Sequence, residues 1–460
     1  MNATKSDRRR PNVIFILSDD QGPWAAGCYG NDEIRTPNID RLAATGTRFD
    51  RFFCTSPVCS PSRASFLTGR IPSQHGIHEW VHPDRNMGPG ATEYLREEIA
   101  YTDVLAAHGY HCGLSGKWHM GDSIKPQHGF DFWYAHQQGG GPYNNAPMVR
   151  DGEAINDPGY VTDLMTDEAL GYIDRHRDDS FYLSVHYTAP HSPWIDQHPQ
   201  EIVDSYDDCP FESCPQEPMH PWAISLTDQN LGNREALKGY FASVTAMDLG
   251  IGRIVDRVEA LGLREDTLIC FFADNGFSCG HHGFWGKGNG TWPRNMYENS
   301  VRVPGIMSQP GAFPTGVCDA MVSAYDFMPT LLDYLDFEIP VQQNLPGRSI
   351  LPILRGERAQ LSESICVFDE YGPVRMIRTE DWKYVYRHAH GPDDLFHLAE
   401  DPDERANLAD DPGYQDRRRE LCGMMDQWFE RYVIPERDGL IERSEMAFQR
   451  EYRGRLCDRR

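Results

Sequence analysis

The stretch NVIFILSDD, residues 12–20, is an apolar run that ends in a serine and two adjacent aspartates. Three later runs have the same form, namely YHCGLS (110–115), FYLSVHY (181–187) and TLICFFA (267–273), and charged or ligating residues follow each within a few positions. Short runs that are apolar throughout are typical of strands covered on both faces, as in a parallel sheet. Because binding groups gather beyond the carboxyl ends of such strands, the four runs predict one site built from four distant segments.

Helical patterns lie between these runs. The stretch 37–46 begins with a proline and ends at a glycine, 234–262 is long and periodic, and 324–336 is shorter. Residues 193–233 are rich in Pro, Asp and Cys, and we expect an irregular insertion there. The alternation of strands and helices predicts an α/β fold with a large mixed, mostly parallel sheet flanked by helices.

The pattern changes after about residue 357. The stretch 374–388 predicts two antiparallel strands around a polar turn, and 415–433 predicts a helix. We therefore expect a main domain over residues 1–357 and a smaller C-terminal α+β subdomain with an antiparallel sheet over residues 358–460.

The composition excludes some classes of partner. The 460 residues include 69 acidic and 44 basic ones, which gives a net charge of -25. A nucleic-acid binder needs the opposite sign to neutralise phosphates, so we expect no nucleic-acid partner, although a few local cations can still hold a small anion. No apolar stretch reaches the roughly 18 residues that a membrane-spanning helix needs, so we expect no membrane partner.

The N-terminus and the cysteines bear on the compartment. The first apolar run, Val13 to Leu17, is too short for the core of a signal peptide, so we expect a cytoplasmic protein, or a periplasmic or secreted one if a leader has been removed. The 12 cysteines form no CxxC pair, which argues against a zinc ribbon, and we expect them to be reduced. Cys209 and Cys214 are near enough in sequence for a bridge, which a reducing compartment disfavours.

Adjacent acids follow two of the predicted strands. Asp19 and Asp20 follow the first, and Asp274 and Asn275 follow the strand at 267–273. Neighbouring buried carboxylates repel each other unless a cation compensates, and hard oxygen ligands suit Ca²⁺ or Mg²⁺ better than zinc. The alternative is that each pair caps a turn, but two such pairs at matching strand ends favour a metal site.

The stretch SPVCSPSRASFLTGR, residues 56–70, predicts a short helix with Ser60 as N-cap and Gly69 at its end. Cys59 then lies at a helix N-terminus, where the dipole favours an anion and lowers the pKa of a thiol. Arg63, one turn further on, can face the same anion. Two plainer alternatives are a buried structural thiol and an unmodified reactive thiolate.

Within that stretch, CSPSRASFLTGR resembles the signature of the type I sulfatases of the alkaline phosphatase superfamily. Further motifs that are similar to family segments are PNVIFILSDDQG (11–22), GKWH (116–119), APHSPW (189–194), FFADNG (271–276) and DLFHLAEDPDERANLADDP (394–412). The resemblance therefore covers nearly the whole chain and implies an alkaline phosphatase-like fold.

The family resemblance implies the chemistry. In type I sulfatases a dedicated formylglycine-generating enzyme oxidises the signature cysteine, so that enzyme becomes an expected partner during maturation. The hydrated aldehyde has two hydroxyls, one to attack sulfur and one to release sulfate afterwards. We expect a sulfuric ester hydrolase acting on a small sulfated substrate, a sugar sulfate, in bacterial polysaccharide breakdown. The alternatives are a phosphonate monoester or phosphodiester hydrolase of the same superfamily and a non-enzymatic binder of sulfated glycans.

The resemblance also implies roles for individual residues. Cys59 would be the nucleophile and would touch the metal. The ligands of that metal, Ca²⁺ with Mg²⁺ as the alternative, would be Asp19, Asp20, Asp274 and Asn275.

The basic residues of the motifs would surround the sulfate. Arg63 would orient the hydrate and Lys117 would bind a sulfate oxygen. His119 would be the base, and His191 would contact the ester oxygen. Lys287 would be the second sulfate ligand, and it also matches a proton donor to the leaving group.

The remaining expected contacts concern the substrate. Arg294 is the reserve for Lys287, and His282 is a further candidate for contact with the leaving group. The segments 75–86, 136–145 and 193–233 are expected to line the pocket mouth. The candidate substrate contacts within and beyond them are Trp80, Tyr143 and Trp194 as stacking rings, and His388 and His390 from the C-terminal subdomain.

Overall fold

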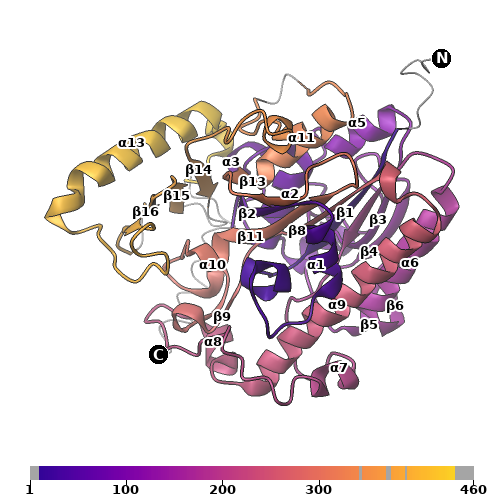
Figure 1. Cartoon of the computed structure of the whole chain (residues 1–460), viewed down its shortest axis with the longest axis horizontal. Coiled ribbons are helices and arrows are strands. Elements are labelled where there is room, and N and C mark those ends of the chain that lie inside the picture. The colour runs from indigo at the N-terminus through magenta and orange to yellow at the C-terminus, as the bar shows by residue number, and fades with distance from the viewer. Residues whose placement is uncertain (1–9, 341–343, 369–373, 389–390, 441–460) are drawn as a thin grey trace.

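One mixed sheet forms the centre of the protein. The computed structural model describes residues 10–340, 344–368, 374–388 and 391–440 (Figure 1). In spatial order the strands are β12 (Gly316–Cys318), β2 (Thr47–Phe53), β11 (Arg302–Ser308), β8 (Thr267–Ala273), β1 (Asn12–Ser18), β7 (Phe181–His186), β3 (His111–Lys117), β4 (Phe132–His136), β5 (Asn144–Arg150) and β6 (Glu153–Tyr160), with β13 (Val322–Ser323) beside β2. The four runs singled out in the sequence are the neighbours β8, β1, β7 and β3, and they are parallel, as predicted.

The register of the central strands brings their carboxyl ends to one level. Ser18, the last residue of β1, lies opposite Ala273, the last residue of β8. The backbone N–H of Asp274 donates to the carbonyl of Ser18 at 3.0 Å. The acids that follow the two strands therefore leave the sheet side by side.

Helices cover both faces of the sheet, as Figure 1 shows. Ile14 and Ile16 of β1 pack on the face covered by the first group of helices, and Phe15 and Leu17 pack on the face covered by the second. The first group is α1 (Pro37–Ala44), α6 (Val161–His176) and α9 (Arg234–Ala260), and the second is α2 (Cys59–Thr68), α5 (Tyr101–Ala107) and α11 (Phe327–Tyr334). The shorter helices are α3 (Pro72–His75), α4 (Pro83–Asn86), α7 (Gln200–Asp204), α8 (Ser225–Asn230), α10 (Glu298–Val301) and α12 (Leu351–Leu354). The sequence predictions of α1, α9 and α11 are confirmed, and residues 193–233 are irregular apart from α7 and α8.

A second, antiparallel sheet lies in the C-terminal part, next to the long helix α13 (Gln415–Tyr432), which is yellow in Figure 1. Its strands in order are β14 (Ile365–Phe368), β15 (Val374–Arg378), β16 (Trp382–Arg387) and β17 (Asp394–His397). The predicted strand pair and helix are confirmed. One hydrophobic cluster includes both Phe66 of α2 and Met425 of α13, so the core is continuous, and the boundary at residue 357 stays a prediction.

Within the described chain, no helix combines the length and the apolar character needed to cross a membrane.

Candidate active site

The helix that carries the cysteine motif begins two residues earlier than predicted. Cys59 is the first residue of α2, and the extended Val58 occupies the N-cap position assigned to Ser60. The Ser60 hydroxyl instead accepts a hydrogen bond from the backbone N–H of Val81 at 3.0 Å. Gly69 ends the helix with a φ of 68°, as predicted. The serine therefore ties the loop around Val81 to the start of α2, beside the cysteine.

Burial decides the state of the thiol. Cys59 is 3% exposed. Burial, together with the negative charge of Asp19, raises the pKa of Cys59 to about 11, against the opposing effects of Lys117 and Lys287. The predicted lowering by the helix dipole is therefore wrong, and the unmodified side chain is a protonated thiol at neutral pH. This observation weighs against the alternative of a plain reactive thiolate.

Four oxygen-bearing side chains converge where β1 and β8 end. Carboxylate oxygens of Asp19, Asp20 and Asp274 lie within 4.8 Å of one another. The Asn275 Nδ2 donates to Asp20 Oδ1 at 2.7 Å. Asp19 Oδ1 and Asn275 Oδ1 are buried and have no hydrogen-bond partner within the described residues. Buried oxygens without a donor, close to further carboxylates, fit a hard divalent cation.

The charge states of these acids differ because their neighbours differ. Burial, followed by repulsion from Asp19, raises the pKa of Asp274 to about 6. Burial also acts to raise the pKa of Asp19, but attraction to Lys117 and other nearby cations holds it well below its usual range. Asp19 therefore remains ionised more firmly than Asp274.

Two lysines contact these carboxylates. The Nζ of Lys117, the last residue of β3, pairs with Asp19 Oδ2. The Nζ of Lys287 pairs with Asp20 Oδ1 and also donates to Cys59 Sγ at 3.1 Å. Lys287 thus connects the acids to the cysteine.

Arg63 lies behind the acids. Its Nε donates to Asp274 Oδ2 at 2.8 Å, and its Nη1 donates to the carbonyl of Lys117 at 2.9 Å. In the described chain it forms no hydrogen bond with Cys59, so its contacts orient the carboxylates and β3. The three acids are therefore matched by three cations, and the charges of this buried cluster balance.

Two histidines complete the ring around the cysteine. The Nε2–H of His119 donates to the carbonyl of Val81 at 2.9 Å, and its buried Nδ1 has no hydrogen-bond partner in the described residues. Burial, followed by the charge of Lys117, holds the pKa of His119 well below its usual value, so Nδ1 has a free lone pair. The second ring belongs to His191, and burial lowers its pKa as well.

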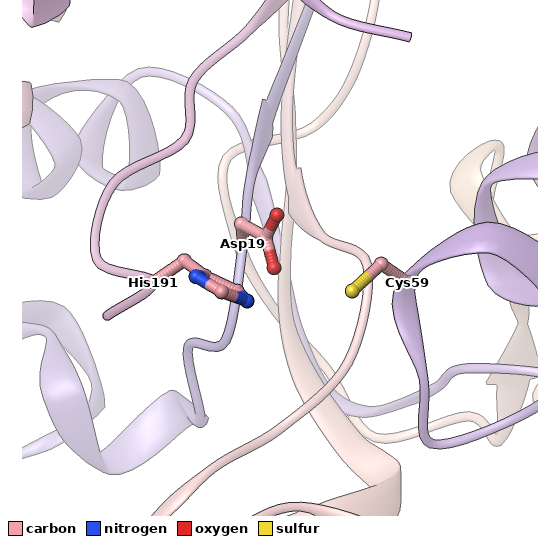
Figure 2. Close-up of side chains that lie close together, drawn as sticks. All are labelled: Asp19, Cys59 and His191. Carbon is pink, nitrogen blue, oxygen red and sulfur yellow. The ribbon is translucent and has the colours of Figure 1, made fainter. Parts of the chain in front are cut away.

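Figure 2 shows the side chains of Asp19, Cys59 and His191 directed toward one another from three separate segments. Their potential ligand atoms lie within 4.8 Å of one another. His191 Nε2 is 3.8 Å from Asp20 Oδ2, and its Nδ1–H donates to the carbonyl of Ser192 at 2.7 Å. The histidine is thus held with its Nε2 toward the acids.

A cavity of about 340 Å³ opens onto these groups. It is lined by Val58, Cys59, Trp80, Val81, Pro83, His119, Gln138, Gly139, Gly140, His191, Lys287 and Asn289. The predicted lining segments 75–86 and 136–145 both contribute, whereas the cavity-lining set contains no residue of 193–233.

Three consecutive glycines, Gly139 to Gly141, form what we call the glycine strap. A Cβ atom at Gly139 would lie 2.1 Å from His119 Cε1, and one at Gly140 would lie 2.8 Å from His191 Cε1. Only residues without a side chain fit against both rings. The sequence analysis missed this function of the strap, although three adjacent glycines between two motifs were a visible signal.

Two of the expected stacking rings are structural. Trp194 is 3% exposed, packs against Phe277 and donates from Nε1 to the carbonyl of Pro190 at 2.7 Å. Tyr143 is buried and its hydroxyl donates to the carbonyl of His191 at 2.7 Å. Apolar packing holds both rings away from the cavity, where Trp80 remains.

Three further expected substrate contacts also lie outside the cavity lining. The ring of His282 stacks on Tyr297 with centroids 3.9 Å apart. Arg294 is 1% exposed, and its guanidinium lies 4.9 Å from the ring centre of Trp292. His388 is exposed, and His390 lies outside the described residues. Lys287 rather than Arg294 is therefore the cation beside Cys59.

Comparison with protein families decides the class. A family model described as Sulfatase matches residues 11–337. The chain belongs to the sulfatase family. A second model, described as N-sulphoglucosamine sulphohydrolase, C-terminal, matches residues 280–430. The protein is accordingly a sulfuric ester hydrolase, a type I sulfatase of the alkaline phosphatase superfamily.

Relatives of this sulfatase agree with that assignment. N-acetylglucosamine-6-O-sulfatase of Bacteroides thetaiotaomicron is 26% identical, with 94% of this chain and 88% of the relative covered. Human arylsulfatase A is 30% identical over 82% of this chain and 74% of its own length. A solved structure described as a complex with its substrate D-glucosamine-2-N,6-O-disulfate has a TM-score of 0.79 at 24% identity, covering 94% of this chain and 99% of the other. The structural likeness establishes the fold.

Proposed function

We propose that this sulfatase cleaves the sulfate ester of a small carbohydrate, with residue 59 acting after its oxidation to formylglycine and with Ca²⁺ bound by the neighbouring acids. The observation that carries the proposal is the position of Lys287, whose Nζ contacts both Cys59 Sγ and Asp20. One cation thereby links the nucleophile position, the metal acids and the cavity. The curated relative N-acetylglucosamine-6-O-sulfatase supports a sugar substrate.

The proposed modification agrees with the state of the thiol. A buried cysteine with a pKa of about 11 is a poor nucleophile at neutral pH. The unmodified thiol carries no negative charge there, so it gives no reason for the cations that surround it. The chemistry that residue 59 supplies after modification is a nucleophilic hydroxyl and a second hydroxyl on the same carbon. Mass spectrometry of the peptide that contains residue 59 tests this step, because replacement of the thiol by an aldehyde lowers the peptide mass.

The donor set fits a divalent cation. Asp19, Asp20, Asp274 and Asn275 offer oxygen atoms only, which suits Ca²⁺, with Mg²⁺ as the alternative. When bound, the cation supplies positive charge that polarises a sulfate oxygen. The negative charges of the acids are already balanced by the basic residues of the cluster. The positive charge of a bound metal ion therefore remains available to attract an anionic substrate. Removal of metal by EDTA should abolish turnover, and separate addition of Ca²⁺ and Mg²⁺ should identify the metal.

The remaining residues bind the sulfate and move protons. Lys287 places its ammonium group against Cys59 Sγ, and Lys117 places one on Asp19, whose carboxylate lies within 4.8 Å of that sulfur. Such point charges suit the binding of a tetrahedral anion. His119 Nδ1 is the available proton acceptor, because Val81 fixes the proton on Nε2. His191 lines the cavity from the other side, where it can contact the leaving oxygen.

The cavity sets the size of the substrate. A volume of about 340 Å³ suits one sulfated sugar ring, with Trp80 as the aromatic wall and Gln138 and Asn289 as polar groups. We therefore expect release of sulfate from a single or terminal sugar rather than from the interior of a polymer. The net charge of -25 also opposes binding of a polyanionic chain.

A substrate panel tests the proposal. Protein with verified formylglycine is assayed on defined sulfated monosaccharides, on 4-nitrophenyl sulfate and on a phenyl phosphonate ester, with Cys59→Ala as the control. Desulfation of a monosaccharide that is lost in Cys59→Ala supports the proposal. Preference for the phosphonate ester would establish the alternative hydrolase, and absence of all hydrolysis would indicate a binding protein.

A further inference from the structure

A separate cluster of side chains that can bind a metal lies at the amino end of β3, opposite the strand ends that form the active site. It consists of His111, the first residue of β3, His176, the last residue of α6, and Asp179. The active-site residue Lys117 is at the other end of the same strand, which at about 3.3 Å per residue places it roughly 20 Å away. The cluster is therefore independent of the sulfate site.

The three side chains are already gathered. Their potential ligand atoms lie within 4.8 Å of one another, and His176 Nδ1 is 3.8 Å from Asp179 Oδ2. The centroids of the two imidazole rings are 4.4 Å apart. The backbone supports this arrangement, because the N–H of Asp179 donates to the carbonyl of His176 at 2.9 Å and the N–H of His111 donates to Ser180 at 3.2 Å.

A fourth residue orients one of the rings. Asp131 Oδ2 accepts a hydrogen bond from His111 Nδ1 at 2.8 Å. This bond places the proton on Nδ1 and leaves Nε2 as the nitrogen with a lone pair. A carboxylate behind a histidine is the usual arrangement for histidines that bind zinc.

We propose that His111, His176 and Asp179 form a second metal site, which takes a zinc-type transition-metal ion. Two imidazoles and one carboxylate suit Zn²⁺ and similar ions, whereas Ca²⁺ prefers oxygen ligands, so the two sites of this protein differ in metal preference. The side chains of His111 and Asp179 are 45% and 55% exposed, so water can occupy the remaining coordination position. A bound ion ties the end of α6 to the start of β3.

Zinc titration of the full-length protein tests this site. The protein competes with a zinc-binding dye for Zn²⁺ while saturating Ca²⁺ occupies the oxygen-only site. Wild type is compared with the double variant His111→Gln/His176→Gln. We expect the wild type to bind one more equivalent of Zn²⁺ than the double variant. Asp131→Asn should weaken that equivalent by about 10- to 100-fold, because the carboxylate only orients the ring.

A matched control comes from the small sheet. His397 lies 3.1 Å from Glu400, so it repeats the histidine–carboxylate spacing of His176 and Asp179 without a second imidazole in that pair. His397→Gln should bind Zn²⁺ as the wild type does. All variants should keep the thermal stability of the metal-free wild type, and only proteins with the intact cluster should gain stability from Zn²⁺.

Equal zinc stoichiometry and affinity in wild type and the double variant would overturn the proposal. The result does not depend on turnover, so a failure to find sulfated-sugar hydrolysis would leave it standing.

Discussion

Replacement of Gly139 by alanine tests how the glycine strap positions His119. The new Cβ would lie 2.1 Å from His119 Cε1, so the ring must move by about 1.3 Å before the two carbons reach an ordinary contact of 3.4 Å. A shift of that size breaks the 2.9 Å hydrogen bond from His119 to the carbonyl of Val81. Misplacement of a reacting group by about 1 Å costs roughly 100-fold in rate, or about 2.7 kcal/mol of activation free energy.

The strap provides its own control. A Cβ at Gly141 would lie 3.5 Å from His136, which is an ordinary contact, and neither Gly139 nor Gly141 has a positive φ that alanine would strain. Gly141→Ala should therefore stay within about threefold of wild type. At Gly140 the Cβ would lie 2.8 Å from His191, so Gly140→Ala should give an intermediate loss.

The assay is kcat/KM on 4-nitrophenyl sulfate, with two checks on each variant. The formylglycine content of residue 59 is measured by mass spectrometry, because poor maturation would imitate the effect. Thermal unfolding shows that the fold is retained. If Gly139→Ala with normal modification is as active as Gly141→Ala, either the strap does not fix His119 or His119 takes no part in the chemistry.

Further substitutions distinguish residues that the sequence alone offered as candidates for the same kind of substrate contact. Lys287→Met should lower kcat by about 10²- to 10³-fold, because it removes a preorganised donor, while His282→Gln should keep nearly full activity in the same assay. Trp80→Ala should raise KM for a sugar sulfate without loss of stability, whereas Trp194→Ala should lower the free energy of unfolding by about 3–5 kcal/mol in urea titrations. Burial raises the pKa of Asp326, the residue that directly precedes α11, from 3.8 to about 7. Between these values the folded state binds more protons than the unfolded state, so stability falls as pH rises from about 4 to 7. Asp326→Asn should flatten this part of the profile of urea midpoint against pH, and an unchanged slope would contradict the assignment.

Local patterns in the sequence determined the central strands and the main helices, and the resemblance to the sulfatase family supplied the residues expected around Cys59. A strand buried on both faces must be apolar throughout, and acids at its end need a cation, so both features are readable without coordinates. The cysteine motif likewise predicted the helix α2 and the glycine, Gly69, at which it ends. The segments 12–20 and 267–273 could be assigned to one site because parallel strands end at one edge.

Only the tertiary structure decided how buried each of these groups is and what lies against it. The thiol of Cys59 has a raised rather than a lowered pKa because distant segments exclude water from it. The sequence made Trp80 and Trp194 equal candidates for stacking on the substrate, but of these two only Trp80 lines the cavity. The position of the glycine strap against two histidines and the meeting of His111 with His176 are also long-range contacts. Sequence periodicity reports which face of an element is buried, whereas charge state, cavity shape and contact depend on which other element covers it.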